Sequence, residues 1–399
     1  MKYLIFIVCI LTGCSTKPTT NGSTSSENDS VKINKKDLIV IDITKHPEKT
    51  INLEEIANVE YIPLETNDST FVNLALPDVV SDKYIVYHNK NGQVLVFNRK
   101  GKRLYSFNRR GGGPEEYSAI LDIILDEKEE ELYIEDICIA KIYVYSINGK
   151  FKRKLALPKN FFPACLTNYD KDYLFCYNDF MGMNENMQKN KLSQEDIKNR
   201  DNPYFFISKQ TGEIIPFNYA IPNRMDNQAF EIKNGKITGI QMMKIYPLSH
   251  NTPDIMITEF ADDTLYYLKE KKLVPIIIKK PSTHRMDPPT MLAVDLFTDR
   301  YIFILAYKKR FDGDRMSGIY IVYDKQVDEF YQLRSNLPIS IPMKENYISL
   351  PHNTGITSKR AEYLLQDYND GKLEGKLKEI ASKLKEDDNP VLILIKFKE

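Results

Sequence analysis

The chain has 399 residues, of which 42% are hydrophobic, so it is long enough to bury a large core. Lys and Arg together number 55, as do Asp and Glu, and a net charge of zero gives no general attraction to nucleic acid, which excludes it as an expected partner. The 25 Tyr and 19 Phe residues suit the pleated, half-buried surface of a sheet, so the composition favours an all-β protein.

The first residues have the pattern of an export signal. A basic start at Lys2 is followed by an apolar run at 4–11, which is too short to cross a bilayer as a helix. The run ends in Leu11-Thr12-Gly13-Cys14, which resembles the lipobox of bacterial lipoproteins. That resemblance implies that residues 1–13 are removed and that the Cys14 thiol carries a lipid anchor. The alternative is an ordinary buried cysteine after a hydrophobic start.

The residues after the signal predict a tether. Residues 14–35 are rich in Ser, Thr, Asn and Gly, a composition that cannot bury apolar area and is typical of a flexible linker. Residues 36–399 then form one folded domain. We expect a cell-envelope protein held at the outer membrane by its lipid and facing the periplasm or the outside. The segment 15–19 lacks an acidic run, which slightly favours the periplasmic side.

Beyond residue 80 the chain consists of short aromatic and β-branched runs separated by polar turns, as in antiparallel strands. The runs lie at 84–87, 93–97, 131–135, 141–145, 173–177, 204–207, 264–268, 301–305 and 318–324. A turn containing Gly follows the second run of a pair at 98–102, 146–150 and 208–212. The pattern recurs about every 50 to 60 residues, which indicates about six repeats. Because a four-stranded unit cannot bury both faces alone, we predict a six-bladed β-propeller with about four strands per blade.

The C-terminal part predicts two helices and a closing strand. Residues 361–368 and the series Leu373, Leu377, Ile380 and Leu384 have helical spacing, and 391–395 is an uninterrupted apolar strand. A ring must remove its open edge. We therefore predict that this last strand pairs with the N-terminal region near 59–64. A mainly polar stretch at 181–202 predicts an inserted loop.

A Gly-rich segment at 107–117 is the most specific motif. It is followed by the strands expected at 120–126, 131–136 and 141–145, an order that looks like one NHL-type propeller repeat. Together with the lipobox, it resembles the six-bladed β-propeller lipoproteins of the Bacteroidetes, whose loop pattern Arg-x-Gly-x-Gly-Pro-x-Glu-Tyr matches the residues Arg109, Gly111, Gly113, Pro114, Glu116 and Tyr117. The segments 60–66 and 263–266 are similar to that family as well. Residues 139–141 depart from the Asn-Asn-Arg usual in NHL repeats, so NHL ligand rules do not carry over.

This loop has a structural and a functional interpretation. Its glycines permit positive φ in a tight crossing between blades, Pro114 fixes its own φ, and Arg109 could pair with Glu116. We favour this structural interpretation over a ligand site. A phosphate-binding loop is disfavoured because no Lys-Ser or Lys-Thr follows.

Candidate catalytic and metal-binding residues are few. The five histidines, His46, His88, His250, His284 and His352, are scattered without metal-ligand spacing. Of these, His250 near Asp254 and His284 near Asp287 could reach a channel mouth. The acidic run 126–131 predicts a solvated turn, and 262–263 another. We therefore predict that the protein has no metal site and no cofactor, and we assign no catalytic residue.

Three cysteines remain after removal of the signal and acylation of Cys14. Cys138, Cys165 and Cys176 are an odd number, which argues against a disulfide framework and favours three small buried hydrophobic residues. A bridge between Cys165 and Cys176 is the alternative, because an exported protein could form it.

The resulting functional hypothesis is a non-enzymatic binding or scaffold lipoprotein. Its propeller face would meet a glycan, a peptide or an envelope protein, and its lipid would meet the membrane. The rival hypothesis is a hydrolase or lyase that uses carboxylates and His at the central channel, since propellers support both kinds of function.

Overall fold

The aromatic and aliphatic runs form strands in the computed structural model of the protein. The structure describes residues 38–67, 71–72, 75–136, 138–158, 161, 163–178, 202–221, 224–225, 228–234, 236–242, 246–252, 254–312, 315–335 and 348–399. These residues belong to one compact unit, Asn34–Glu399. The predicted loop at 181–202 lies outside the described residues except for Asn202.

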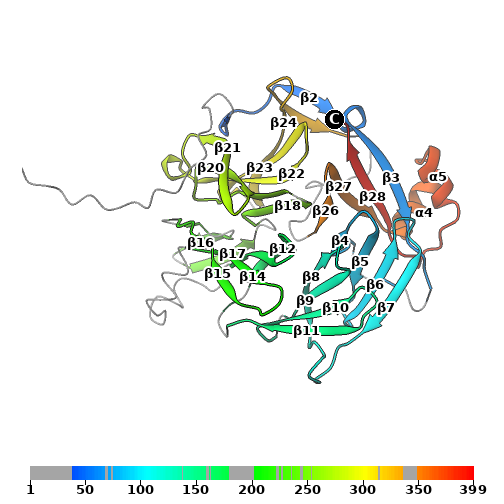
Figure 1. The fold of residues 1–399 in the computed structure, drawn as a ribbon. Coiled ribbons are helices and arrows are strands. Elements are labelled where there is room, and N and C mark those ends of the chain that lie inside the picture. The colour runs from blue at the N-terminus through cyan, green and yellow to red at the C-terminus, as the bar shows by residue number, and fades with distance from the viewer. Residues whose placement is uncertain are drawn as a thin grey trace, which may run out of the picture. The chain divides into compact units, whose positions relative to one another are not determined.

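The described strands form six blades arranged as a ring, which confirms the predicted fold (Figure 1). Blades 1 to 3 each have four antiparallel strands in chain order from the inside outward. Their strands are β4 (Val79–Val80), β5 (Tyr84–His88), β6 (Gln93–Asn98) and β7 (Arg103–Asn108); β8 (Ile120–Asp126), β9 (Glu131–Asp136), β10 (Lys141–Ser146) and β11 (Phe151–Ala156); and β12 (Pro163–Asn168), β13 (Tyr173–Asn178), β14 (Tyr204–Ser208) and β15 (Ile214–Pro216).

Blades 4 and 5 repeat this order, and each receives a further strand from the N-terminal region. Their own strands are β18 (Leu248–Thr252), β19 (Asp254–Ile257), β20 (Thr264–Lys269) and β21 (Lys272–Lys280); and β22 (Thr290–Phe297), β23 (Tyr301–Asp312), β24 (Arg315–Asp324) and β25 (Glu329–Arg334). Strand β1 (Ile39–Asp42) adds in parallel to β21, and β2 (Lys49–Asn52) adds in parallel to β25. The N-terminal segment thus covers two outer edges that would otherwise be open.

Blade 6 closes the ring with strands from both ends of the described chain. Its sheet runs from β27 (Thr354–Lys359) through β28 (Val391–Phe397) to β3 (Ala57–Pro63). Strand β28 pairs antiparallel with β3 over its whole length, from Val391 opposite Pro63 to Phe397 opposite Ala57. This confirms the predicted closure. The residues 391–395 are all fully buried, as an uninterrupted apolar strand requires.

The outer hairpin turns of blades 1 to 3 depend on a glycine. Gly101, Gly149 and Gly212 stand at the same position of three outer hairpin turns and have φ of +78°, +85° and +77°. A side chain is disfavoured at such φ. At Gly101 a Cβ would also lie 2.1 Å from the carbonyl oxygen of Pro63, so the turn can approach the closing strand only without a side chain.

Two helices are inserted between β27 and β28. Helix α4 (Ala361–Asn369) agrees with the prediction, whereas α5 (Gly375–Ala381) is shorter than the series from Leu373 to Leu384 predicts. Gly371, between the two helices, and Gly375, the first residue of α5, have positive φ, so the chain turns where α5 begins. Leu373 and Leu384 still pack with the buried face of α5 and with Tyr61 of β3.

Further elements extend the basic pattern. The hairpin of β16 (Gln228–Lys233) and β17 (Lys236–Met242) follows blade 3 and packs against β23. Short helical turns lie at α1 (Leu53–Ile56) and η2 (Thr283–Arg285).

The cysteines do not form the alternative bridge. Cys165 and Cys176 lie on neighbouring strands of blade 3, but they belong to the cores on opposite sides of this sheet. Neither forms a disulfide bond, and both are buried as predicted. Cys138 is exposed, so the prediction that it is buried is wrong. It lies in the turn between β9 and β10.

Candidate functional site

Main chain spans the interior of the ring. Strand β26 (Leu350–Pro351) pairs in parallel with β18, the inner strand of blade 4. Ser349 bridges to blade 1 on its other side: its carbonyl accepts the Val80 N–H at 2.8 Å, and its own N–H donates to the Asp78 carbonyl at 3.3 Å. Blades 1 and 4 face each other in a ring of six. The segment 349–351 therefore lies in the middle of the ring, where the rival hypothesis places its central channel (Figure 1).

A cavity of about 610 Å³ lies against this central segment; we call it the basin. It is formed by the first turns of blades 1 and 2, the end of β12 in blade 3, and the chain around β26. Its lining residues are Val79, Val80, Ser81, Asp82, Lys83, Leu125, Asp126, Glu127, Lys128, Asn168, Ser349, Pro351 and His352. Four separate parts of the chain thus meet at one cavity in the middle of the ring.

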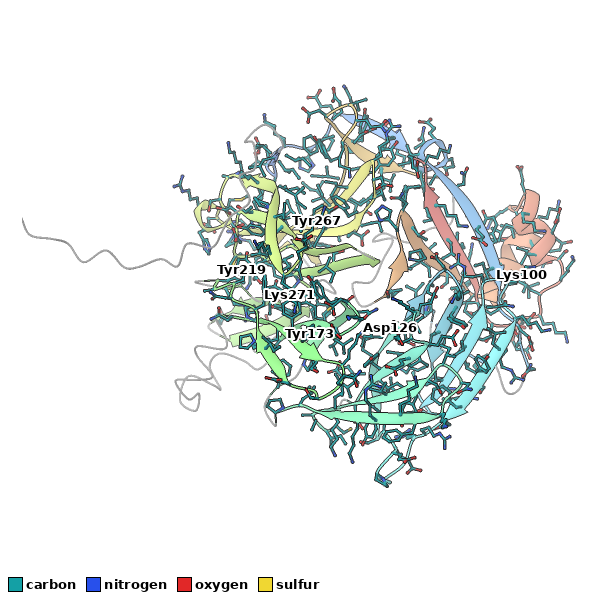
Figure 2. The ribbon with its side chains drawn as sticks, viewed as in Figure 1. Lys100, Asp126, Tyr173, Tyr219, Tyr267 and Lys271 are labelled. Carbon is teal, nitrogen blue, oxygen red and sulfur yellow. The ribbon has the colours of Figure 1, made fainter. Side chains whose placement is uncertain are left out.

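One wall of the basin is held by a buried ion pair. Asp126 accepts a hydrogen bond from Lys209 Nζ at 2.5 Å, and the two side chains are only 6% and 1% exposed. Lys209 also donates to the Asp170 carbonyl within blade 3, so its ion pair with Asp126 ties blade 2 to blade 3. Figure 2 shows Asp126 toward the middle of the ring. A pair removed from water in this way is rigid, and breaking it leaves a buried charge.

The acidic run 126–131 is therefore not a fully solvated turn. Asp126 and Glu131 at its two ends are buried, and Glu131 binds both Arg153 and Lys152. Burial alone would raise the pKa of Glu131, but these cations outweigh it and lower the pKa to about 2. Lys128, between the two ends, is exposed as predicted.

The remaining polar groups of the basin carry both signs of charge. Asp82 and Lys128 are exposed. Glu127 accepts the N–H of Lys83 at 3.3 Å, and His352 contacts Asp299 at 2.8 Å. With an apolar floor at 79–80, this surface suits a ligand that has hydroxyl or amide groups and some apolar area.

A second polar cluster is buried between blades 1 and 2. His88 contacts the Asp78 carboxylate through Nδ1 at 2.8 Å and through its backbone N–H at 2.7 Å. Burial lowers the pKa of His88, but the Asp78 carboxylate outweighs it, so the pKa is raised. Burial raises the pKa of Asp122 to about 7, with a further contribution from Asp78, and raises that of Glu135 well above its usual range. The raised pKa values of His88, Asp122 and Glu135 favour the protonated forms of these buried groups.

A third buried cluster joins blades 3 and 4. Tyr204 donates to the Pro247 carbonyl at 3.2 Å and lies 3.3 Å from Glu259, whose pKa burial raises to about 7. Burial also lowers the pKa of Lys279 to about 8, and its Nζ donates to the Phe260 carbonyl. Asp262, predicted to lie in a solvated turn, accepts the Tyr219 hydroxyl at 2.5 Å and so joins this cluster.

The Gly-rich loop connects β7 to β8 and uses its polar groups within the fold. The buried Tyr117 donates its hydroxyl to the Gly92 carbonyl at 2.6 Å and accepts the Arg109 N–H at 3.1 Å. The Arg109 guanidinium donates to the Gly149 carbonyl in blade 2. These contacts join blade 1 to blade 2 and support the structural interpretation.

Two details of the predicted loop are wrong. Arg109 and Glu116 do not pair; Glu116 instead accepts the Gly113 N–H at 2.8 Å. Neither Gly111 nor Gly113 has positive φ. Gly111 is favoured for a different reason: a Cβ there would lie 2.0 Å from the Glu116 carboxylate and would displace it from its hydrogen bond with Gly113. Pro114 contributes its carbonyl, which accepts a hydrogen bond from Lys154 at 3.4 Å.

The histidines are dispersed through the described structure. His284 contacts the Ala261 carbonyl at 2.9 Å, and His250 lies in β18, where its side chain is outside the described set. Among the described residues no group of three His, Cys, Asp or Glu side chains could hold a metal ion. In that same part of the chain, no helix is long and apolar enough to cross a membrane.

Sequence reasoning missed the residues that build the basin and the buried clusters. Asp126 and Lys209 are separated by more than eighty positions, and nothing local to either shows that they meet. The only local signal is a charged residue directly beside an apolar strand, as at Asp122 within 120–125. A charge at an inward position of a strand predicts a buried partner.

Comparison with known proteins gives a family and a fold. Residues 38–396 match the family described as "Domain of unknown function (DUF4934)". A Bacteroides fragilis protein described as exported is similar in structure, with a TM-score of 0.61 at 18% identity over 91% of this chain and 100% of that one. A member of the DUF4221 family from Bacteroides vulgatus has a TM-score of 0.50 at 10% identity over 86% and 97%. No curated protein matches the chain significantly.

Proposed function

The chain belongs to the DUF4934 family, and from its architecture we propose that it is a lipid-anchored binding or scaffold protein of the bacterial cell envelope. The observation that carries the proposal is the basin: a cavity of about 610 Å³ built by four separate parts of the chain, one of which is the central segment of main chain. Such a surface holds a ligand in place by shape and hydrogen bonding.

The anchoring half of the proposal depends on Cys14. The apolar run at 4–11 and the sequence ending in Cys14 support export and acylation. The structural similarity to an exported Bacteroides fragilis protein is consistent with this compartment. One lipid chain alone binds a membrane only marginally, whereas the two chains of a diacylglyceryl cysteine would anchor the protein stably.

Metabolic labelling with a fatty acid tests the anchor directly. The wild-type chain should incorporate label and sediment with membranes, while Cys14→Ala should do neither. A Cys138→Ala variant is the matched control, because Cys138 is the exposed thiol of the folded unit. Label retained by Cys14→Ala would refute acylation at this residue.

The ligand should be a glycan, a peptide or a segment of an envelope protein. The basin combines both signs of charge with apolar side chains, a mixture that suits hydroxyl and amide groups better than a polyanion. Screening glycan and peptide panels by thermal shift should find ligands that stabilise the protein. Asp82→Asn and Lys128→Ala should weaken the shift, whereas Asp387→Asn and Lys272→Ala, at exposed sites outside the basin, should preserve it.

A hydrolase or lyase at the central channel is the rival function. Its strongest support is the buried cluster of Asp78, His88, Asp122 and Glu135, since carboxylates with raised pKa can act as acids. The hydrogen bonds between Asp78 and His88 have an evident structural use, which favours binding. The glycans and peptides of the same panels should also be tested as substrates for hydrolysis or elimination. Turnover abolished by Asp122→Asn in a variant that still folds would replace the binding proposal.

A further inference from the structure

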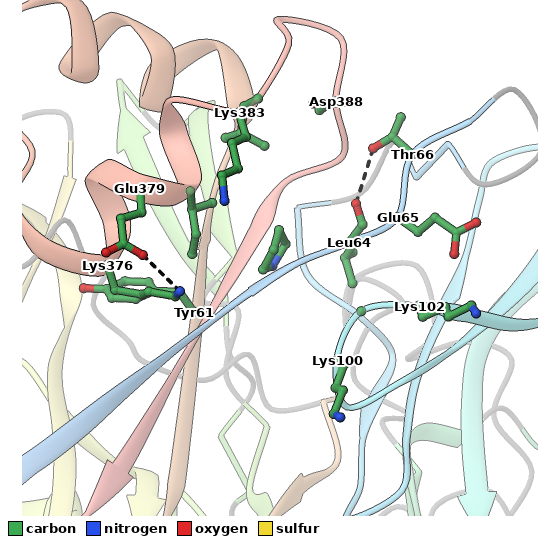
Figure 3. Close-up of a pocket in the computed structure, with 14 residues that line it drawn as sticks. Tyr61, Leu64, Glu65, Thr66, Lys100, Lys102, Lys376, Glu379, Lys383 and Asp388 are labelled. Atoms are coloured by element: carbon green, nitrogen blue, oxygen red, sulfur yellow. Dashed lines mark hydrogen bonds and ion pairs between the residues drawn. The ribbon is translucent and has the colours of Figure 1, made fainter.

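A second cavity lies on the outer edge of the ring, away from the basin; we call it the outer groove. Its volume is about 520 Å³. It lies between three elements: the end of β3 with the residues that follow it, the β6–β7 turn, and α5 with the chain beyond it (Figure 3). Its lining includes Tyr61, Leu64, Lys100, Lys102, Ile380 and Lys383.

One wall of the outer groove is an element that the ring itself does not need. Strands β27 and β28 pair directly with each other, yet about thirty residues containing α4 and α5 are inserted between them. The insertion packs on β3 through Leu377, Ile380 and Tyr61. A direct hairpin would close blade 6 equally well. The insertion therefore adds a surface to the edge of the ring.

The acidic and basic groups of the outer groove differ in whether they have partners. Its three carboxylates already accept hydrogen bonds: Glu65 from the Arg103 N–H, Glu379 from Lys376, and Asp388 from the Lys385 N–H. By contrast, the ammonium groups of Lys100, Lys102 and Lys383 form no ion pair or hydrogen bond with any described residue. Figure 3 shows Lys383 on the side of the helical insertion and the other two on the side of the β6–β7 turn. The groove thus offers cationic donors on both sides of an apolar floor.

The floor lies at the outer edge of a strand. Strand β3 is the last of the described strands in its sheet, where it pairs with β28, and just beyond its end the Glu65 N–H donates to the Gly101 carbonyl of the β6–β7 turn at 2.8 Å. The outer strands of blades 4 and 5 occupy the equivalent position, and there β1 and β2 add as parallel strands. In this molecule an outer edge therefore receives extended chain, which is the geometry of strand addition by a peptide.

We propose that the outer groove is a docking site for an extended acidic peptide segment of a protein partner. The partner's carboxylates would meet Lys100, Lys102 and Lys383, and its apolar side chains would lie on Tyr61, Leu64 and Ile380. This site is separate from the basin, so the protein would hold a small ligand and a protein partner at the same time.

Fluorescence anisotropy with a labelled peptide of alternating Glu and Leu tests the proposal on the purified protein. The peptide should bind, and binding should weaken at high salt because exposed charges are screened. The triple variant Lys100→Glu, Lys102→Glu and Lys383→Glu should bind at least about tenfold more weakly, as expected for the loss of three exposed ion pairs. The control triple variant Lys90→Glu, Lys171→Glu and Lys272→Glu has the same net charge at exposed sites outside the groove and should bind like wild type.

Three outcomes would overturn the docking site. Equal weakening in both triple variants would show only a net-charge effect. Equal binding of a Glu-Ser peptide would remove the role of the apolar floor. Full competition by inorganic phosphate or by phosphatidylglycerol vesicles would assign the lysines to a phosphate or a lipid headgroup. None of these results affects ligand binding at the basin, which the variants at Asp82 and Lys128 report separately.

Discussion

Closure of the ring by β28 makes a quantitative prediction for Leu394. This side chain is fully buried and packs with Leu392, Ile356 and Phe97 in the core shared by blades 6 and 1. Truncation of a fully buried leucine to alanine costs about 2–5 kcal/mol of unfolding free energy. Leu394→Ala should therefore lower the midpoint of urea unfolding clearly. Because the chain has no Trp, far-UV circular dichroism is the suitable readout.

The same strand provides a control and a more severe test. Lys396→Ala removes an exposed ion pair with Glu60, and such pairs contribute about 0–1 kcal/mol. Deletion of 390–399 removes five fully buried aliphatic residues, each stabilising by roughly 1.5–3 kcal/mol, or about 8–15 kcal/mol together. That equals the net stability of a typical domain, about 5–15 kcal/mol. An unchanged melting temperature after the deletion, or equal midpoints for Leu394→Ala and Lys396→Ala, would refute the closure.

Three further predictions concern the loop and the buried charges. Gly111→Ala should destabilise by about 1 kcal/mol or more, because the new Cβ displaces a hydrogen-bonded carboxylate, while Gly112→Ala meets no atom within 4 Å and should be near neutral in the same urea assay. Asp126→Asn should cost roughly 3–5 kcal/mol since it leaves Lys209 buried without its counter-ion, and a midpoint equal to wild type would contradict that. Burial raises the pKa of Asp122 from 3.8 to about 7, so the native state retains a proton that the unfolded chain releases, and the unfolding free energy should fall as pH rises from about 4 to 7. Asp122→Asn should reduce this dependence of the unfolding free energy on pH. If the substitution leaves the dependence unchanged, another group causes it.

The sequence predicted the middle strands of blades 1 to 3 well, because they are patterned by local rules. Strands β5, β6, β9, β10, β13 and β14 coincide with the aromatic runs, and the glycines at 101, 149 and 212 mark their outer turns. The closing pair of β3 and β28 was also predicted, since an uninterrupted apolar run must be covered on both faces. These features depend on side-chain type and spacing along the chain, which the sequence displays directly.

The site could not be predicted in the same way, because its parts are far apart in the sequence. Strands β1 and β2 were missed since each has only four residues and gains its stability from the edge it covers. The crossing of the ring interior by 349–351 depends on two inner strands that face each other only after six blades have closed.

The amino-acid sequence by itself determined the fold class, the number of repeats and the strand that closes the ring, since hydrophobic period and turn residues act over a few positions. Only the tertiary structure decided which charges are buried, what fills the centre and where cavities form. Those properties arise when separate blades meet, and the free energy of a charge depends on what surrounds it in space.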